Sequence, residues 1–167
     1  MNHASYCIAD KVIFGSYPYD REKLQSLLDE GVNIFVDLTT SEEKNKRSLY
    51  PYHLELSERN TLISFPIEDL GIPKDLELFN ETIDTLSKII HGNNQDKIYI
   101  HCRGGHGRAG VIVACLMAKY YSIDSKEAIK LTNEYHQKRP IMKSRWRKLG
   151  SPQTKIQKRF VSTFVDG

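Results

Sequence analysis

The sequence predicts a single α/β domain with a central, twisted and mainly parallel sheet flanked by helices. Its 167 residues suit one domain. Short apolar runs typical of buried strands alternate with segments whose apolar residues recur at helical spacing, which is the pattern of α/β proteins. No repeat, linker or low-complexity segment interrupts this alternation. We therefore expect residues 1–167 to form one domain.

Composition narrows the class of protein further. Hydrophobic residues make up 40% and charged residues 27% of the chain, which excludes a disordered protein. No apolar run approaches the roughly 20 residues of a membrane span, and the N-terminus lacks the features of a secretory signal. The three cysteines, Cys7, Cys102 and Cys115, form no spaced disulfide framework. These features predict a cytoplasmic protein in a reducing compartment.

The first elements follow from apolar runs and turn residues. Residues 11–14 are a short strand candidate that stops at a glycine and a proline turn. A helix is expected over residues 20–30, with Asp20 as its N-cap and Gly31 after its end. Residues 32–38 form a nearly continuous apolar run, as expected of a buried strand.

The middle of the chain alternates in the same way. Residues 39–60 are polar and predict an irregular segment, and residues 61–67 predict a strand. Pro73 is expected to open a helix that runs to about Ile90, because its apolar residues recur at helical spacing. Residues 97–101 predict the next strand.

Three helices are expected in the last part of the chain. The first covers residues 107–121 and is rich in Val, Ile, Leu and Ala. The second covers residues 124–138, with Asp124 and Glu127 as a capping box. A basic loop then leads to a last helix at about residues 153–164.

Residues 101–110 carry the chemical information, and they read His-Cys-Arg-Gly-Gly-His-Gly-Arg-Ala-Gly. We call residues 102–108 the 102–108 loop. A glycine-rich loop between a strand and a helix aims several backbone N–H groups at one point, where the helix dipole adds positive potential. Glycines also let the backbone approach a ligand closely. The segment therefore predicts an anion-binding site.

Three chemistries can be drawn from this segment. Residues 105–110 match the dinucleotide pattern G-x-G-x-x-G, but a helix is predicted next, where that fold needs a strand. A metal site of His101, Cys102 and His106 fits no common zinc spacing. The third chemistry is nucleophilic attack on phosphorus. A helix N-terminus stabilises the Cys102 thiolate, and Arg108 can grip two phosphate oxygens with its planar fork.

The pattern His101-Cys102-x5-Arg108 resembles the signature of the cysteine-dependent protein tyrosine and dual-specificity phosphatases. Residues 65–73, the 65–73 loop, look like the general-acid loop of small dual-specificity members, especially the group resembling the cyclin-dependent kinase inhibitor phosphatase. Residues 151–157 are similar to the glutamine segment of tyrosine-specific members. The resemblance implies a phosphatase-like strand–phosphate loop–helix unit and hydrolysis through a phosphocysteine, with no cofactor or metal.

The leaving group in such a reaction needs a proton, so a carboxylic acid must lie opposite the loop. Asp69 is the candidate, and its neighbour Glu68 is the alternative. By resemblance, Gln153 would orient the water of the second step and Gln157 would support it.

The resemblance also assigns the loop residues. His101 would support the loop, and Cys102 and Arg108 would act with Asp69 in catalysis. After the arginine the family usually has Ser or Thr, whose hydroxyl helps the sulfur leave, and here the residue is Ala109. The implied phosphate-binding residues are Arg103, Gly104, Gly105, His106, Gly107, Arg108 and Ala109.

The expected substrate is a phosphorylated protein, carrying phosphotyrosine or phosphoserine and phosphothreonine. The same fold could instead act on RNA 5′-phosphates or phosphoinositides, and Ala109 leaves open a weakly active phosphate-binding module. Tyr50 and Tyr52 could stack on a phosphotyrosine or cap the sheet.

The C-terminal part of the chain is strongly basic. Residues 138–167 contain nine Lys or Arg residues and one acidic residue, although the whole chain has a net charge of only +3. Four of these basic residues surround Trp146: Lys143, Arg145, Arg147 and Lys148. Such a cluster could bind an acidic peptide, a phosphoinositide head group or RNA, or it could be a solvated loop.

Overall fold

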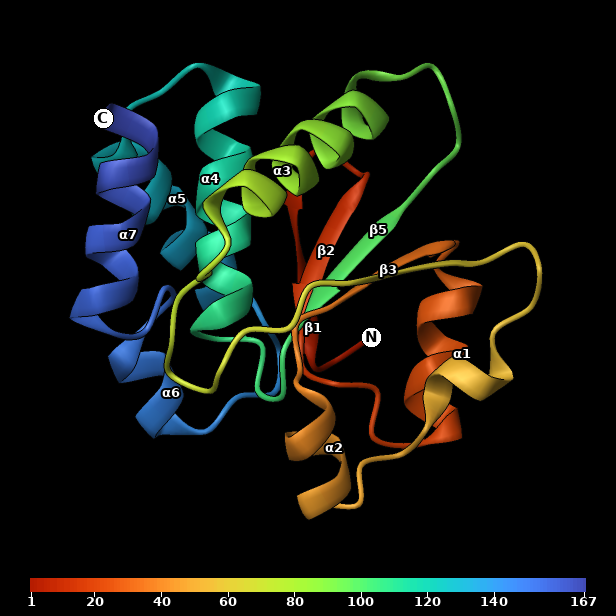
Figure 1. The fold of residues 1–167 in the computed structure, drawn as a ribbon. Coiled ribbons are helices and arrows are strands. Elements are labelled where there is room, and N and C mark those ends of the chain that lie inside the picture. The colour runs from red at the N-terminus through yellow and green to blue at the C-terminus, as the bar shows by residue number, and fades with distance from the viewer.

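The computed structural model describes all residues, 1–167, as a single α/β domain (Figure 1). Its five-stranded sheet has the order β1-β2-β5-β3-β4. Only the β1–β2 pair is antiparallel, and the other three pairs are parallel. The predicted fold class, a mainly parallel sheet flanked by helices, is therefore confirmed. The strands are β1 (Ala4–Ile8), β2 (Val12–Gly15), β3 (Ile34–Asp37), β4 (Thr61–Ser64) and β5 (Ile98–His101).

The parallel strands end in register at one edge of the sheet. His101 pairs with both Gly15 and Asp37, and Asp37 pairs with Ser64. The loops that follow these strands consequently leave the sheet side by side. In open parallel sheets, ligands bind in the crevice at this carboxyl edge.

Helices cover both faces of the sheet (Figure 1). α1 (Arg21–Asp29) and the short 3-10 helix η1 (Tyr52–Glu55) cover one face, where they enclose the smaller apolar core with Phe35 and Tyr99. Val36 and Ile100 face the larger core on the other side, as the two-residue period of strands requires. That face is covered by α3 (Leu76–His91), α4 (Arg108–Tyr121), α5 (Ser125–Gln137) and α7 (Lys155–Asp166).

α4 lies at the centre of this helical layer. Every residue from Arg108 to Ala118 is buried, because α3, α5 and α7 all pack against the helix. None of the helices combines the length and the apolar composition needed to cross a bilayer.

Two boundaries differ by three residues from the sequence prediction, and the others agree to within two. β4 ends at Ser64 and not at residue 67, since Pro66 has no N–H group to donate to the sheet. α3 begins at Leu76 and not at Pro73, because Asp75 is its N-cap.

Three helices have side-chain N-caps that bear on the prediction. The predicted N-caps Asp20 and Asp124 are confirmed, with carboxylate bonds of 2.8 and 2.9 Å to backbone N–H groups. The reciprocal capping box, however, lies at the start of α7, where Thr154 pairs with Gln157. At α5 only the Asp124 half of the predicted box is formed.

The sequence prediction missed four short elements: β1, η1, α2 (Ser41–Lys46) and α6 (Ser144–Leu149). α2 and α6 have six residues each and bury no side chain, so no apolar stripe reveals them. β1 is an edge strand that pairs with one neighbour only. α2 does carry a local signal, because the Thr40 hydroxyl accepts from the N–H of Glu43 at 3.1 Å.

Candidate active site

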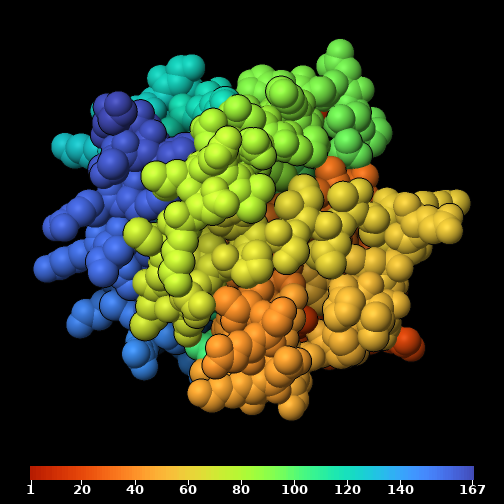
Figure 2. Space-filling model, viewed as in Figure 1, coloured from red at the N-terminus to blue at the C-terminus, as the bar shows by residue number.

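A pocket of about 180 Å³ opens at the carboxyl edge of the sheet. Four parts of the chain form it: the segment after β2, the 65–73 loop, the 102–108 loop and the region around α6 and the start of α7. In Figure 2 the 65–73 loop (yellow-green) lies against α2 (orange), with α6 (blue) beside them. The lining residues are Tyr19, Asp69, Leu70, Cys102, Arg103, Gly104, His106, Gly107, Arg108, Trp146, Gln153 and Gln157.

Cys102 lies at the floor of this pocket. It directly follows β5, and only 3% of its surface is exposed. Its Sγ accepts a hydrogen bond from the N–H of Gly105 at 3.2 Å. The sulfur therefore faces backbone donors at the N-terminal end of α4.

The 102–108 loop leaves most of its backbone N–H groups unpaired. Apart from the Gly105 bond to sulfur, the other five donors that follow Cys102 in the loop have no acceptor within the protein: the N–H groups of Arg103, Gly104, His106, Gly107 and Arg108. A backbone with so many unpaired donors beside a helix N-terminus is an anion-binding nest.

The carbonyl groups of the same loop are bound on its outer side. The carbonyl of Arg103 accepts from the N–H of Tyr17 at 3.0 Å and from the hydroxyl of Tyr19 at 2.9 Å. The carbonyl of His106 accepts from the hydroxyl of Ser151 at 2.5 Å. Because the carbonyls are turned outward, their oxygens do not repel an anion inside the loop.

Arg139, which follows α5, holds the middle of the loop. Its guanidinium donates to the carbonyls of Gly104 at 3.1 Å and Gly105 at 2.9 Å. Only 2% of Arg139 is exposed, so the charge is buried directly against the loop. Charge-assisted bonds of this kind are stronger than neutral ones.

Gly105 is needed for the close approach of this loop to the sheet. Its φ of +73° lies in the left-handed region, and a Cβ there would stand 2.2 Å from the carbonyl of Gly15. No other residue fits this position without moving the backbone.

Arg108 is the most strongly paired side chain of the pocket. Its guanidinium donates to both carboxylate oxygens of Glu43, at 2.7 and 3.0 Å, and to the carbonyl of Ile67 at 3.0 Å. It also donates to Asp69 at 3.1 Å. Burial alone would lower the pKa of Arg108, but the bonds to Glu43 and the negative groups around it, Cys102 included, raise it. The guanidinium therefore stays charged.

Asp69 reaches into the pocket from the 65–73 loop. Besides Arg108 it accepts from Arg103 at 3.3 Å, yet its side chain is 47% exposed. The alternative acid, Glu68, does not line this pocket and faces the adjoining hollow beside α2. The geometry thus places Asp69, and not Glu68, beside Cys102 and Arg108.

The two predicted glutamines both line the pocket, but only Gln157 has its side chain hydrogen-bonded within the protein. The side chain of Gln157 is fully buried, and its oxygen accepts from the N–H groups of Gln153 and Thr154. Its amide donates to the carbonyl of Gly71 at 3.1 Å, so it ties α7 to the 65–73 loop. The side chain of Gln153 forms no hydrogen bond within the protein and is free to bind a water molecule.

His101 and Tyr52 form a buried pair behind the loop. Burial lowers the pKa of His101, although the charge of Asp37 opposes this. The neutral ring donates from Nδ1 to the carbonyl of Cys102 at 3.1 Å and accepts at Nε2 from the Tyr52 hydroxyl at 2.7 Å. Tyr52 is thus a sheet-side partner of the loop, and its complete burial favours the sheet cap over substrate stacking, the two alternatives that the sequence left open for it.

His106 belongs to a separate buried pair with His136. Their rings share a hydrogen bond of 2.8 Å, and burial together with the charge of Arg139 lowers the pKa of each to about 3. Trp146 stacks on His106 with ring centroids 4.9 Å apart. Since His101 and His106 have different partners, they do not form a metal site with Cys102, and no group of three potential ligands is found elsewhere.

Sequence reasoning missed several residues that shape the site. The sequence analysis assigns no role to Glu43 or Tyr19. It includes Arg139 only among the basic residues of the C-terminal region. The spacing Thr40-x-x-Glu43 is a helix-start pattern that could have located α2. No local signal identifies Arg139, because its partners are 34 and 35 residues away.

Comparison with known proteins agrees with the geometry. Residues 2–161 match the family model described as "Swiss Army Knife protein, DSP-PTPase phosphatase domain". The chain is 40% identical over 166 residues to "Putative tyrosine phosphatase 067L" of Invertebrate iridescent virus 3, and the match covers 98% of this chain. It is 38% identical over 152 residues, 90% of this chain, to "Putative tyrosine phosphatase 197R" of Invertebrate iridescent virus 6. These matches span 66% and 49% of the two relatives' own lengths.

A solved structure with the same fold is that of kinase associated phosphatase, with a TM-score of 0.74 and 23% identity. The match covers 98% of this chain and 94% of that one. The family resemblance seen in the sequence is thereby confirmed. The chain belongs to the dual-specificity and tyrosine phosphatase (DSP-PTPase) domain family, in the group described by the Swiss Army Knife phosphatase model.

Proposed function

We propose that this protein hydrolyses phosphomonoesters on proteins, foremost phosphotyrosine, through a phosphocysteine intermediate and without a metal ion. One observation carries the proposal: five residues with unpaired backbone N–H groups, Arg108 with its guanidinium among them, line the same pocket as Cys102. These groups supply the positive field that a transferring phosphoryl group needs.

In the first step, the Cys102 thiolate attacks phosphorus and an S–P bond forms. The P–O bond to the leaving phenol or alcohol breaks, and the Asp69 carboxyl group gives its proton to the leaving oxygen. Arg108 and the N–H groups of the 102–108 loop hold the three remaining phosphoryl oxygens.

In the second step, water attacks phosphorus and the S–P bond breaks. Asp69 takes the proton of this water, inorganic phosphate leaves and the thiolate is restored. We assign the orientation of this water to Gln153, and the unpaired state of its side chain at the pocket wall supports the assignment. Gln157 supports this step indirectly, because it fixes the 65–73 loop through Gly71.

The test is a comparison of substrates in EDTA. Phosphotyrosine and phosphothreonine peptides, a 5′-phosphorylated RNA and a phosphoinositide are offered at equal concentrations, and phosphate release is measured. Fastest release from the phosphotyrosine peptide supports the proposal. Fastest release from the RNA or the lipid would replace the substrate class, and binding of a phosphopeptide without release would identify a binding module.

Ala109 predicts a slow second step. The residue is fully buried in the first turn of α4, and no side-chain hydroxyl reaches the Cys102 sulfur. We expect para-nitrophenyl phosphate to give an initial burst of phenol, followed by slow turnover. Ala109→Ser should raise the steady-state rate about ten- to a hundredfold, the value of one hydrogen bond to a charged group. An unchanged rate, in a variant of unchanged thermal stability, would contradict this account.

Arg139 is predicted to act as a positioning residue for the 102–108 loop. Arg139→Lys replaces a forked pair of bonds by a single donor, so we expect a phosphate dissociation constant about tenfold higher and a KM raised more than kcat is lowered. Arg21→Lys is the control for loss of a guanidinium, because Arg21 pairs with Glu55 and contacts neither Arg139 nor the loop. Equal loss of phosphate affinity in both variants would show only general destabilisation.

A further inference from the structure

A cation lies beside the pocket, over the indole of Trp146. Trp146 lines the pocket and stacks on His106 with an interplanar angle of 16°. The guanidinium of Arg145 lies over the same indole, 5.0 Å from the ring centroid. The side chains of His106, Trp146 and Arg145 therefore form a row that leads from the 102–108 loop to the exposed guanidinium of Arg145.

Arg145 has no acidic partner in the protein. It takes part in no ion pair or side-chain hydrogen bond, and the same is true of the lysines beside it on α6, Lys143 and Lys148. Arg147, in contrast, uses its guanidinium to bind backbone carbonyls. A stacked guanidinium that lacks a counter-charge is available to an external anion.

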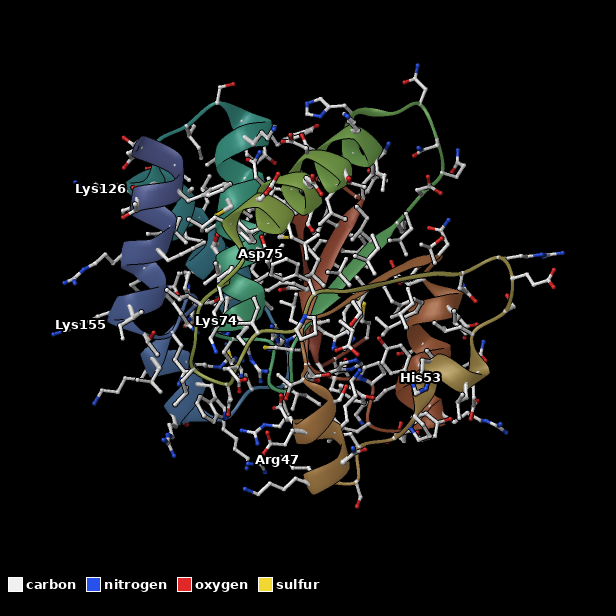
Figure 3. The ribbon with its side chains drawn as sticks, in the orientation of Figure 1. Arg47, His53, Lys74, Asp75, Lys126 and Lys155 are labelled. Carbon is white, nitrogen blue, oxygen red and sulfur yellow. The ribbon has the colours of Figure 1, made fainter.

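More unpaired cations continue this surface along α7. Lys155, Lys158 and Arg159 are exposed, and Lys155 points outward at the N-terminal end of the helix (Figure 3). We call Lys143, Arg145, Lys148, Lys155, Lys158 and Arg159 the basic surface. Figure 2 shows long side chains of this C-terminal part projecting along one edge of the molecule.

The opposite side of the pocket is mixed in charge. The hollow beyond Asp69 is lined by Glu42, Glu43, Glu68 and Asp69 together with Lys46 and Arg47, and both Glu43 and Asp69 are already paired with Arg108. A polyanion that passed across the whole pocket, such as RNA or an anionic membrane, would meet carboxylates as well as cations there, whereas the basic surface carries cations alone. The one-sided charge instead suits a ligand whose negative groups lie to one side of the phosphate.

We propose that Arg145 and the basic surface select phosphotyrosine peptides that carry acidic side chains next to the phosphotyrosine. This inference rests on the proposed function. The phosphate occupies the 102–108 loop, and an Asp or Glu carboxylate a few residues away reaches Arg145 over Trp146.

The experiment measures kcat/KM at low salt for two phosphotyrosine peptides, one with flanking glutamates and one with glutamines in their place. We expect the wild-type protein to prefer the acidic peptide, and Arg145→Glu to lower this preference about three- to tenfold. The preference should also fall as salt rises, because exposed charges are screened. Lys126→Glu is the control for the same reversal of charge, since Lys126 is on α5 and lies near the C-terminal end of α7, far from Lys155 (Figure 3).

The outcomes separate the two claims. Equal rates on both peptides, or an equal loss of preference in Lys126→Glu, would overturn the role of Arg145 while the proposed function stands. Hydrolysis of para-nitrophenyl phosphate but of neither peptide would contradict the proposed function itself. A loss in Arg145→Glu confined to phosphoinositide vesicles or 5′-phosphorylated RNA would assign the basic surface to that partner and overturn the inference.

Discussion

Cys102→Ser is expected to reduce phosphate release to the background rate. A serine hydroxyl is ionised far less readily than a thiol, and no side-chain base is hydrogen-bonded to the Sγ of residue 102, whose partner is the N–H of Gly105. Loss of a covalent nucleophile costs on the order of 10⁶-fold in kcat. The measurement is hydrolysis of para-nitrophenyl phosphate and of a phosphotyrosine peptide by equal amounts of folded protein.

The chain offers a matched control for this substitution. Cys115→Ser makes the same change at another buried cysteine, on α4 and outside the pocket, where burial raises the pKa of the thiol. We expect this variant to remain active. Cys102→Ser should still bind tungstate, because the unpaired N–H groups and Arg108 are unchanged.

More than 1% residual turnover in Cys102→Ser would contradict a phosphocysteine intermediate. Loss of tungstate binding in the same variant would point to a collapsed loop and not to the missing nucleophile.

The 102–108 loop was predictable because its chemistry is local. The strand that ends at His101, the glycines and the spacing from Cys102 to Arg108 lie within one short segment. The buried strand β3 and the helix α4 were predictable for a similar reason, since each is a continuous apolar stretch. Local pattern thus predicts the core elements and the anion-binding backbone.

The partners that hold this loop were not predictable, because they are distant in sequence. Glu43 is 65 residues from Arg108 and Arg139 is 35 residues from Gly104. A charged residue in a polar segment reads as a solvated side chain unless its neighbours in space are known. The partner of Tyr52 was not predictable for the same reason. From the sequence, Tyr52 could either contact a substrate or cap the sheet, and its bond to His101 spans 49 residues.

Gln157 illustrates a further limit of the sequence. Its position within the glutamine segment could be predicted by resemblance, but its complete burial could not. Its bonds to Gln153, Thr154 and Gly71 show that the side chain joins two segments of the pocket wall. Lining a pocket and being available to substrate are therefore different properties.

Asp69→Asn is the second substitution with a large expected effect. An amide cannot protonate the leaving oxygen, so kcat should fall about 10²- to 10⁴-fold. The loss should be larger for phenyl phosphates with poor leaving groups than for para-nitrophenyl phosphate, whose phenolate leaves without a proton. The measurement is kcat across a series of aryl phosphates of rising phenol pKa.

The same variant should bind phosphate more tightly. In the free protein the Asp69 carboxylate accepts from Arg108 at 3.1 Å and from Arg103 at 3.3 Å, and both are donors that an incoming phosphate needs. Removing this negative charge removes a competitor and its repulsion, so the tungstate dissociation constant should fall several-fold.

Glu68→Gln separates the two candidate acids. It neutralises the adjacent carboxylate, which is exposed and faces the hollow beside α2. We expect it to change kcat less than about threefold and to leave tungstate affinity and the leaving-group dependence as in the wild type. A steep leaving-group dependence in Glu68→Gln, with a shallow one in Asp69→Asn, would exchange their roles. Lower kcat combined with tighter tungstate binding is the result expected of Asp69 alone. Its carboxyl group gives a proton to the leaving oxygen, and in the free protein its carboxylate occupies Arg108. Loss of the first role lowers kcat, and loss of the second frees Arg108 for tungstate.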